Sequence, residues 1–253
     1  MQQVEQIINW YVLSGVDTFC ADEPVNVLSG ETNKAPEEQK LRPATSVLAQ
    51  SSNAAFLNAK EICRKAESLS ELREMLEKFD GCSLKFSANS TVFGYGNPKA
   101  PLLIVGEAPG ADEDRQGKPF VGRSGHLLDK MLKAIGVERE ECFVSNILPW
   151  RPPGNRTPTD GEIAVCLPFL KRQIELVNPK IILLLGASAA NALLNNSESI
   201  SRLRGHFLEY NIDENHNYPA LATFHPAYLL RSAGQKAKAW NDLLRLKEKL
   251  EKL

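Results

Sequence analysis

Two runs of apolar residues decide the fold: PLLIVG at residues 101–106 and KIILLLG at residues 180–186. Neither run alternates polar and apolar side chains, as a strand with one solvated face would. Strands buried on both faces read in this way, and they are typical of parallel sheets that helices cover on both sides. The sequence therefore predicts a parallel sheet with these two runs inside it.

The elements around these runs alternate between strand and helix. Two further β-rich runs are CFVSNIL at 142–148 and PALATF at 219–224. Helical stretches are predicted between the strands, over 125–135 and 161–177. This alternation of strands and helices indicates an α/β protein, because parallel strands need a crossover that helices usually supply.

The beginning of the chain is organised differently. Apolar residues recur every three to four positions near the start, so residues 1–20 are assigned to an N-terminal helix. Residues 21–50 lose this periodicity and gather Pro, Ser, Thr and Asn, which predicts a flexible linker. The remaining residues, 51–253, form one α/β domain that opens with helices over 51–66 and 69–79.

Composition narrows the class of protein. The chain has 253 residues, of which 43% are apolar, and its formal net charge is −1. A chain of this length buries a large core without disulfides or metals, which excludes disordered proteins and disulfide scaffolds. It contains no run of about 18 apolar residues that would span a membrane, and its start does not read as a signal peptide. Five scattered cysteines suit a reducing compartment, so we expect a cytoplasmic protein.

Polar residues follow three of the predicted strands. Glu107 comes directly after the first strand, Asn146 lies in the second run, and His225 follows the fourth. Because ligands bind beyond the carboxyl ends of the strands in open α/β sheets, we expect these side chains to share one site. The sequence lacks G-x-G-x-x-G, P-loop and H-E-x-x-H motifs, which argues against dinucleotide, P-loop nucleotide and zinc-protease sites.

Four motifs in the region 82–250 resemble the family 4 uracil-DNA glycosylases. They are GEAPGADED at 106–114, GKPFVGRSG at 117–125, NILPWRPPGNR at 146–156 and HPAYLLR at 225–231. The resemblance implies a three-layer α/β/α sandwich around a central four-stranded parallel sheet. The N-terminal residues would then be a helical extension of that fold.

The resemblance also implies a role for each residue of the base pocket. His225 would stabilise the departing uracil anion, Asn146 would read the N3–H and O4 edge, and Phe120 would stack on the base. Glu113 would stand near C5 and exclude the methyl group of thymine. The third position of the first motif is an aspartate in the best-known uracil glycosylases and Ala108 here. Glu107 is therefore the carboxylate expected to activate water, either directly or by ordering the loop.

The remaining expected site residues lie on the same four motifs. Gly106 and Ala108 would line the base pocket, and Asn155 would help to place water. Backbone N–H groups near Ser124 would hold a phosphate of the DNA. A minor-groove loop would supply an apolar wedge and an arginine; its residues are Tyr228, Leu229, Leu230 and Arg231.

The sequence departs from the family pattern at the iron–sulfur site. Family 4 enzymes usually hold a [4Fe–4S] cluster on four cysteines, two of which correspond to Cys82 and Cys166. The other two positions are Phe79 and Trp150. Two thiolates do not hold a cluster that needs four ligands. We therefore expect a branch of the family without the cluster and without any other metal or cofactor.

These expectations combine into one predicted function. The protein would be a monomeric hydrolase, a monofunctional uracil-DNA glycosylase that flips uracil out of DNA and leaves an abasic site in base-excision repair. Its partner would be uracil-containing DNA, with no membrane involved. The alternative is a module on the same fold that binds uracil or abasic DNA without turnover.

Overall fold

The computed structural model describes residues 44–212 and 216–253, with side chains from residue 54 onward. The N-terminal helix predicted over 1–20 lies outside the described residues. The linker predicted over 21–50 overlaps them at its end, where helix α2 (Ala44–Lys65) begins. Residues 44–50 are therefore helical, and the flexible-linker assignment does not hold for them.

The described residues form a sheet of six strands in the order β1-β3-β2-β4-β6-β5. Strands β3, β2, β4 and β6 are parallel to one another. The short edge strands β1 and β5 each pair antiparallel with their neighbour. The strands are β1 (Tyr95–Gly96), β2 (Leu102–Gly106), β3 (Cys142–Asn146), β4 (Ile181–Leu185), β5 (Phe207–Asn211) and β6 (Asn217–Thr223).

The prediction of a four-stranded parallel sheet is therefore wrong for the whole sheet, because two antiparallel edge strands are added to the four parallel ones. The four predicted strands lie together at its centre, and every residue of β2 and β4 is buried, as their continuous apolar runs indicated. The two edge strands escaped prediction for different reasons. Strand β1 has two residues, too few for a pattern, and β5 is largely exposed, so apolar periodicity marks it weakly.

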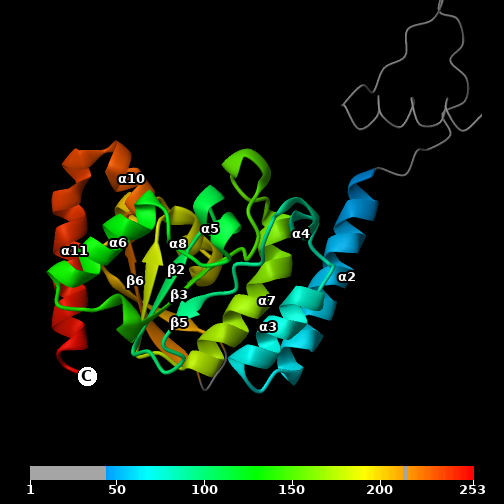
Figure 1. Ribbon diagram of the computed structural model, residues 1–253, viewed down its shortest axis with the longest axis horizontal. Helices are drawn as coiled ribbons and strands as arrows, with labels where there is room; N and C mark the ends of the chain where they lie inside the picture. The colour runs from blue at the N-terminus through cyan, green and yellow to red at the C-terminus, as the bar shows by residue number, and fades with distance from the viewer. Residues whose placement is uncertain (1–43, 213–215) are drawn as a thin grey trace, which may run out of the picture. The chain divides into compact units, whose positions relative to one another are not determined.

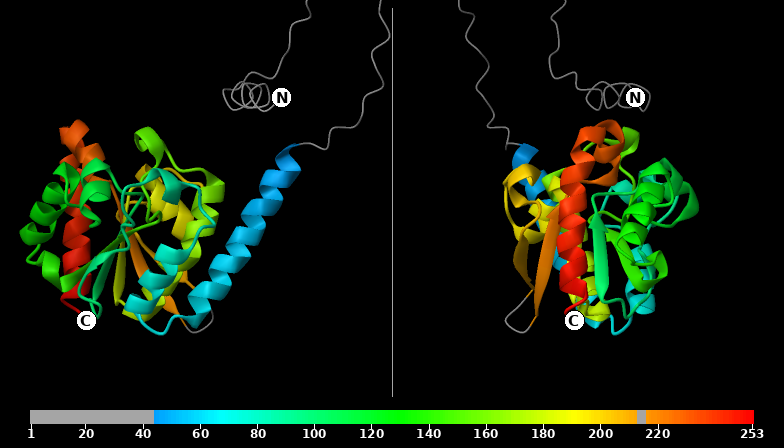
Figure 2. Two further views of the ribbon diagram at one scale, coloured as in Figure 1. Left: turned by 45° about the vertical axis from the view of Figure 1, so that its right-hand side comes forward. Right: turned by 90° about the vertical axis from the view of Figure 1, so that its left-hand side faces the viewer.

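Helices cover both faces of the sheet (Figures 1 and 2). Helices α6, α10 and α11 pack their apolar residues on one face, and α7, α8 and α9 pack on the other. Helices α2 and α3 lie against the outer side of α7 and enclose a third apolar cluster there. None of the helices in the described ranges combines the length and the apolar character that a membrane crossing requires.

The helices have the following bounds: α3 (Leu69–Lys78), α4 (Leu84–Ser87), α5 (Ala111–Gln116), α6 (Arg123–Ala134), α7 (Asp160–Val177), α8 (Ala187–Leu194), α9 (Ile200–Leu203), α10 (Pro226–Arg231) and α11 (Lys236–Leu250). Short 3-10 turns occur at Arg139–Glu141, Pro153–Asn155 and Ala233–Gln235. The helices predicted over 125–135 and 161–177 correspond to α6 and α7, each with slightly different ends. Those predicted over 51–66 and 69–79 correspond to α2 and α3.

One buried ion pair ties α11 to the sheet. The Asp242 carboxylate of α11 accepts hydrogen bonds from Arg204 Nε at 3.0 Å and Arg204 Nη2 at 2.6 Å. It also accepts one from Thr223 Oγ1, at the end of β6, at 2.6 Å. The Asp242 side chain is 2% exposed, so this carboxylate depends on these partners rather than on water.

We expect the Arg204→Ala variant to lose about 3 kcal/mol or more of its free energy of unfolding, because the buried carboxylate loses the cation that hydrogen-bonds to it. Urea denaturation at neutral pH measures this loss. The matched control is Arg73→Ala, which breaks the solvent-exposed Arg73–Glu77 pair on α3. This control is expected to lose less than about 1 kcal/mol. Equal losses in the two variants would contradict a structural role for the buried pair.

Candidate active site

The loops at the carboxyl ends of β2, β3 and β6 enclose a cavity of about 300 Å³. Helices α5 and α10, which follow β2 and β6, lie at this end of the sheet (Figure 1). Nine of the residues expected from the sequence line the cavity: Glu107, Ala108, Glu113, Phe120, Ser124, Asn146, Asn155, His225 and Arg231. The fold thus brings together side chains that are more than 120 positions apart in the chain.

Asn146 is the most unusual polar residue of the cavity. Its side-chain oxygen Oδ1 is buried and has no hydrogen-bond partner in the described part of the protein. Strand pairing places Asn146 opposite Gly106. A Cβ at Gly106 would lie 2.5 Å from Asn146 Oδ1 and 2.6 Å from the Phe120 ring, so only glycine leaves room for both. A buried acceptor without a donor costs free energy, which indicates a place for a ligand N–H.

Phe120 holds a backbone conformation that bulky residues rarely adopt. Its φ is +54°, in the left-handed region. Gly125, in the first turn of α6, permits this conformation, because a Cβ there would lie 1.8 Å from the Phe120 carbonyl oxygen. Backbone strain of this kind costs about 1–3 kcal/mol and is concentrated at functional sites. The Phe120 ring lies 5.7 Å from the His225 ring, centroid to centroid.

His225 is held as a neutral imidazole with a defined tautomer. Its Nδ1 accepts a hydrogen bond from the Ala227 backbone N–H at 3.1 Å, so the ring proton must be on Nε2. Burial, helped by the nearby positive charge of Arg231, lowers the pKa of His225 to about 4. At neutral pH the residue is therefore an uncharged hydrogen-bond donor through Nε2.

Glu113 is anchored by the backbone around it. Oε1 accepts from the N–H groups of Val121 and Gly122 at 3.0 and 2.9 Å, and Oε2 accepts from that of Gly110 at 3.1 Å. The carboxylate thereby joins the start of α5 to the loop that carries Phe120. The side chain is buried at the cavity wall, and among the described residues its hydrogen-bond donors are these three backbone N–H groups.

Glu107 has a partner that sequence reasoning missed. Its Oε2 accepts a hydrogen bond from the hydroxyl group of Ser188, in the first turn of α8. Ser188 follows the predicted strand at 180–186 by two residues. The signal that could have found it was a hydroxyl group at the same carboxyl edge of the sheet as the other expected site residues. The site residues expected from the sequence follow the other three parallel strands alone.

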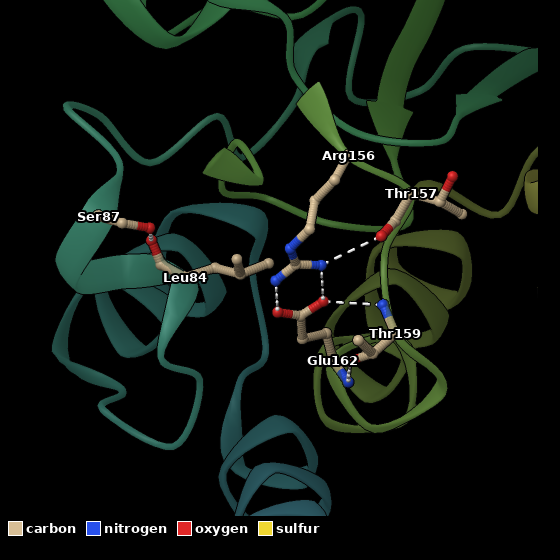
Figure 3. Close-up of polar contacts among 6 residues, drawn as sticks. All are labelled: Leu84, Ser87, Arg156, Thr157, Thr159 and Glu162. Carbon is tan, nitrogen blue, oxygen red and sulfur yellow. Dashed lines mark hydrogen bonds and ion pairs between the residues drawn. The ribbon is translucent and has the colours of Figure 1, made fainter. Parts of the chain in front are cut away.

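The loop after β3 is fixed by an arginine at the cavity. Arg156 binds the Glu162 carboxylate of α7 through two hydrogen bonds of 2.9 and 2.6 Å (Figure 3). Arg156 Nη1 also donates to the Thr157 carbonyl oxygen, and the Thr159 N–H donates to Glu162. Asn155, beside it, accepts from Arg151 Nε at 2.7 Å. The loop therefore lies against the start of α7 as one hydrogen-bonded unit.

One of the four residues expected to form the minor-groove loop is buried in the core. Leu230 is 40% exposed, and Arg231 is exposed beside the cavity. Leu229, however, is 1% exposed and belongs to the apolar cluster beneath α6 and α11. The helical turn directs adjacent leucines to different sides, so Leu229 anchors α10 and is not available to DNA. Tyr228 is half-buried against Phe224, with ring centroids 5.2 Å apart.

The four positions that carry cluster ligands in family 4 meet in one buried apolar cluster between α3, α7 and the loop after β3. Phe79 packs against Phe169 with ring centroids 5.1 Å apart, and Trp150 Nε1 donates to Thr91 Oγ1 at 3.0 Å. A hydrogen bond with Cys82, together with burial, raises the pKa of the Cys166 thiol well above its usual value. Two thiols and two aromatic rings do not fit a cluster that needs four thiolates.

No group of three or more His, Cys, Asp or Glu residues suited to a metal ion occurs within 44–212 and 216–253. Cys63 of α2 belongs to the same buried cluster as Cys82 and Cys166, and Cys142 lies at the start of β3 in another cluster. Burial raises the pKa of the Cys63 thiol and that of the Cys142 thiol to about 12, so both are protonated at neutral pH. Cys20 lies outside the described residues.

The fold and the site define an α/β protein with a polar cavity at the carboxyl ends of its parallel strands, and comparison with known proteins shows which family of this kind it belongs to. The sequence profile of the Uracil DNA glycosylase superfamily matches residues 93–244. A Type-4 uracil-DNA glycosylase from Thermotoga maritima is 38% identical over 175 residues, which cover 69% of this chain and 89% of that protein. One from Saccharolobus solfataricus is 39% identical and covers 73% of this chain and 87% of its own length. The chain belongs to the uracil DNA glycosylase superfamily.

The lowered pKa of His225 predicts a pH dependence of stability. Between about pH 4 and pH 6.5 the unfolded chain binds more protons at this residue than the folded protein, so stability falls as the pH decreases through this window. From about pH 7.5 to pH 5, His225 should account for a loss of about 2 kcal/mol. Urea denaturation of the wild type and of His225→Asn at both pH values measures this contribution.

The wild type should lose about 2 kcal/mol more than His225→Asn over this pH change. The control is His206→Asn, which removes an exposed histidine and should keep the wild-type dependence. If His225→Asn and the wild type lose equal stability, the imidazole is not held neutral by burial.

Proposed function

We propose that this protein is a uracil-DNA glycosylase that binds a flipped-out uracil in the cavity and hydrolyses its N-glycosidic bond. The observation that carries the proposal is the buried, unpartnered Oδ1 of Asn146. The N3–H group of uracil is the donor that this oxygen lacks, and the Asn146 amide group would donate to O4. Cytosine has an unprotonated N3 and an amino group in these places, so it would leave the buried groups unpaired.

His225 would stabilise the departing base. Cleavage of the bond between C1′ and N1 leaves the electron pair on uracil, whose O2 then carries much of the negative charge. The Nε2–H of His225 would donate to O2 as this charge develops. A neutral imidazole suits this task, because it donates a hydrogen bond without having to lose a proton.

Glu107 would activate the water that attacks C1′. In the part of the chain that the structure describes, Ser188 is its hydrogen-bond partner through Oε2, and Oε1 remains for the water. The water oxygen forms a bond to C1′ as the bond to N1 breaks, and its proton passes to the carboxylate. Glu107 then releases this proton to solvent and the uracil anion takes one up from solvent, which completes a hydrolysis with an abasic deoxyribose as product.

Phe120 and Glu113 would complete the recognition of the base. The Phe120 ring lies at the cavity near His225 and would stack on the uracil ring. Glu113 is fixed by three backbone N–H groups, so a thymine methyl group near it could not push it aside at low cost. We assign it the exclusion of thymine.

The DNA would be held at the mouth of the cavity. Arg231 would bind a phosphate, and Leu230 would fill the gap that the flipped base leaves in the stack. The backbone N–H groups at the start of α6, near Ser124, would hold a second phosphate. The protein would act as a monomer in the cytoplasm, where its described cysteines, none of which is in a disulfide, would stay reduced.

The Asn146→Asp variant tests this function. It keeps an acceptor for N3–H and loses the donor to O4, so we expect single-turnover excision of uracil to fall by about 100- to 1000-fold. The assay incubates a labelled oligonucleotide containing one uracil with the protein and then cleaves abasic sites with alkali. The control is Asn241→Asp, an exposed position on α11, which should excise at the wild-type rate.

Wild-type excision by Asn146→Asp would show that Asn146 is not the base reader. If the wild-type protein binds the oligonucleotide and produces no abasic site, the non-catalytic binding module becomes the better assignment.

We further propose that the protein works without an iron–sulfur cluster, because Phe79 and Trp150 fill two of the four ligand positions. Protein purified without oxygen should contain no stoichiometric iron and no broad absorbance near roughly 400 nm. The Phe79→Cys/Trp150→Cys double variant restores four cysteines and serves as the positive control under the same iron and sulfide treatment. About four iron atoms per wild-type chain would contradict the proposal.

A further inference from the structure

The turn between β4 and α8 contacts both residues to which the proposed function gives a chemical role. The Ser188 hydroxyl group donates a hydrogen bond to Glu107 Oε2. In the same turn, a Cβ at Gly186 would lie 3.1 Å from the Cβ of His225, so the turn packs directly against the histidine. One short segment, the turn at residues 186–188, therefore contacts both the Glu107 carboxylate and His225.

The fold places this turn with little freedom. Strand β4 is wholly buried between β2 and β6, and the Gly186 N–H donates to the Thr223 carbonyl oxygen at 2.9 Å. Gly186 has a φ of +91°, a conformation that glycine adopts readily and that lets α8 begin at Ala187. Ser188 therefore lies in the first turn of a helix whose start is set by the sheet itself.

The hydrogen bond from Ser188 determines where the Glu107 carboxylate lies. Glu107 follows β2 on a loop, and without this hydrogen bond its flexible side chain would have several rotamers available. Ser188 is the hydrogen-bond donor to this carboxylate among the described residues. The start of α8 adds a favourable interaction with negative charge, because the helix dipole is positive there. The hydroxyl group and the helix end thus favour one position of the carboxylate beside the cavity.

We propose that Ser188 is the positioning residue for Glu107, an inference that rests on the proposed glycosylase function. Ser188 does not line the cavity, so it acts on the reaction through the carboxylate and not through the substrate. A displacement of about 1 Å at a reacting group lowers a rate by as much as about 100-fold, which makes such a support measurable.

The test is a double-mutant cycle in the single-turnover uracil excision assay. Ser188→Ala should lower the rate by about 10- to 100-fold and leave the dissociation constant for uracil-containing DNA within about twofold. In the Glu107→Ala background, Ser188→Ala should change the residual rate by less than about twofold, because no carboxylate remains to be positioned. Ser188→Thr keeps the hydroxyl group and should be at least about fivefold faster than Ser188→Ala.

The matched control is Ser199→Ala at the start of α9, where the serine is exposed and makes no capping hydrogen bond. It should excise at the wild-type rate. Thermal unfolding of Ser188→Ala should agree with that of the wild type within a few degrees, which separates positioning from a loss of folded protein.

Three outcomes would overturn the role of Ser188 and leave the proposed function intact. They are a wild-type excision rate for Ser188→Ala, an equal loss of rate in the wild-type and Glu107→Ala backgrounds, and no recovery of rate with Ser188→Thr. The wild-type protein is measured in the same assay. If it produces no abasic sites, the proposed function itself is wrong, and the role of Ser188 falls with it.

Discussion

The pairing of Gly106 with Asn146 is the constraint on which the site depends. It places a residue without a side chain beside an amide, at the point where two central parallel strands end. The space above Gly106 is shared by the Asn146 carbonyl group and the Phe120 ring, and any larger residue would displace one of them. The second glycine of this arrangement, Gly125, lets Phe120 keep its left-handed backbone conformation. The shape of the cavity therefore depends on two positions, Gly106 and Gly125, where a side chain would not fit.

The polar groups of the cavity are held by neutral donors more than by opposite charges. Three backbone N–H groups hold Glu113, one holds the ring of His225, and the Ser188 hydroxyl group holds Glu107. Such donors orient a side chain without adding a positive charge that would compete for the substrate or for a developing negative charge. Burial adds to this effect by lowering the pKa of His225. Arg231 and Arg156 are the two arginines among the described residues that line the cavity.

The region between α2, α3 and α7 is held together largely by apolar packing. Phe79 and Cys82 come from the stretch after α3, Trp150 from the loop after β3 and Cys166 from α7, and the four pack into one apolar cluster. Aromatic rings bury a large apolar area, so they stabilise the junction between α3, α7 and the loop after β3 by packing. The loop after β3 carries Asn155 and Arg156 to the cavity, and the Arg156–Glu162 ion pair fastens it to α7. The same loop therefore packs in this cluster through Trp150 and lines the cavity through Asn155 and Arg156.

The sequence by itself determined the four central strands, the two helices α6 and α7 between them, the place of the candidate site at the carboxyl ends of the strands, and the family. These features depend on local apolar runs and on motifs whose residues are adjacent in the chain. The tertiary structure alone decided the two edge strands, because β1 is too short and β5 too exposed to leave a periodic pattern. It also decided that Leu229 is buried while Leu230 is not, since this depends on which side of α10 meets α6 and α11. Ser188 and Glu107 are 81 positions apart. Their contact exists because the β2–β4 pairing brings two loops together, and no local pattern encodes that pairing.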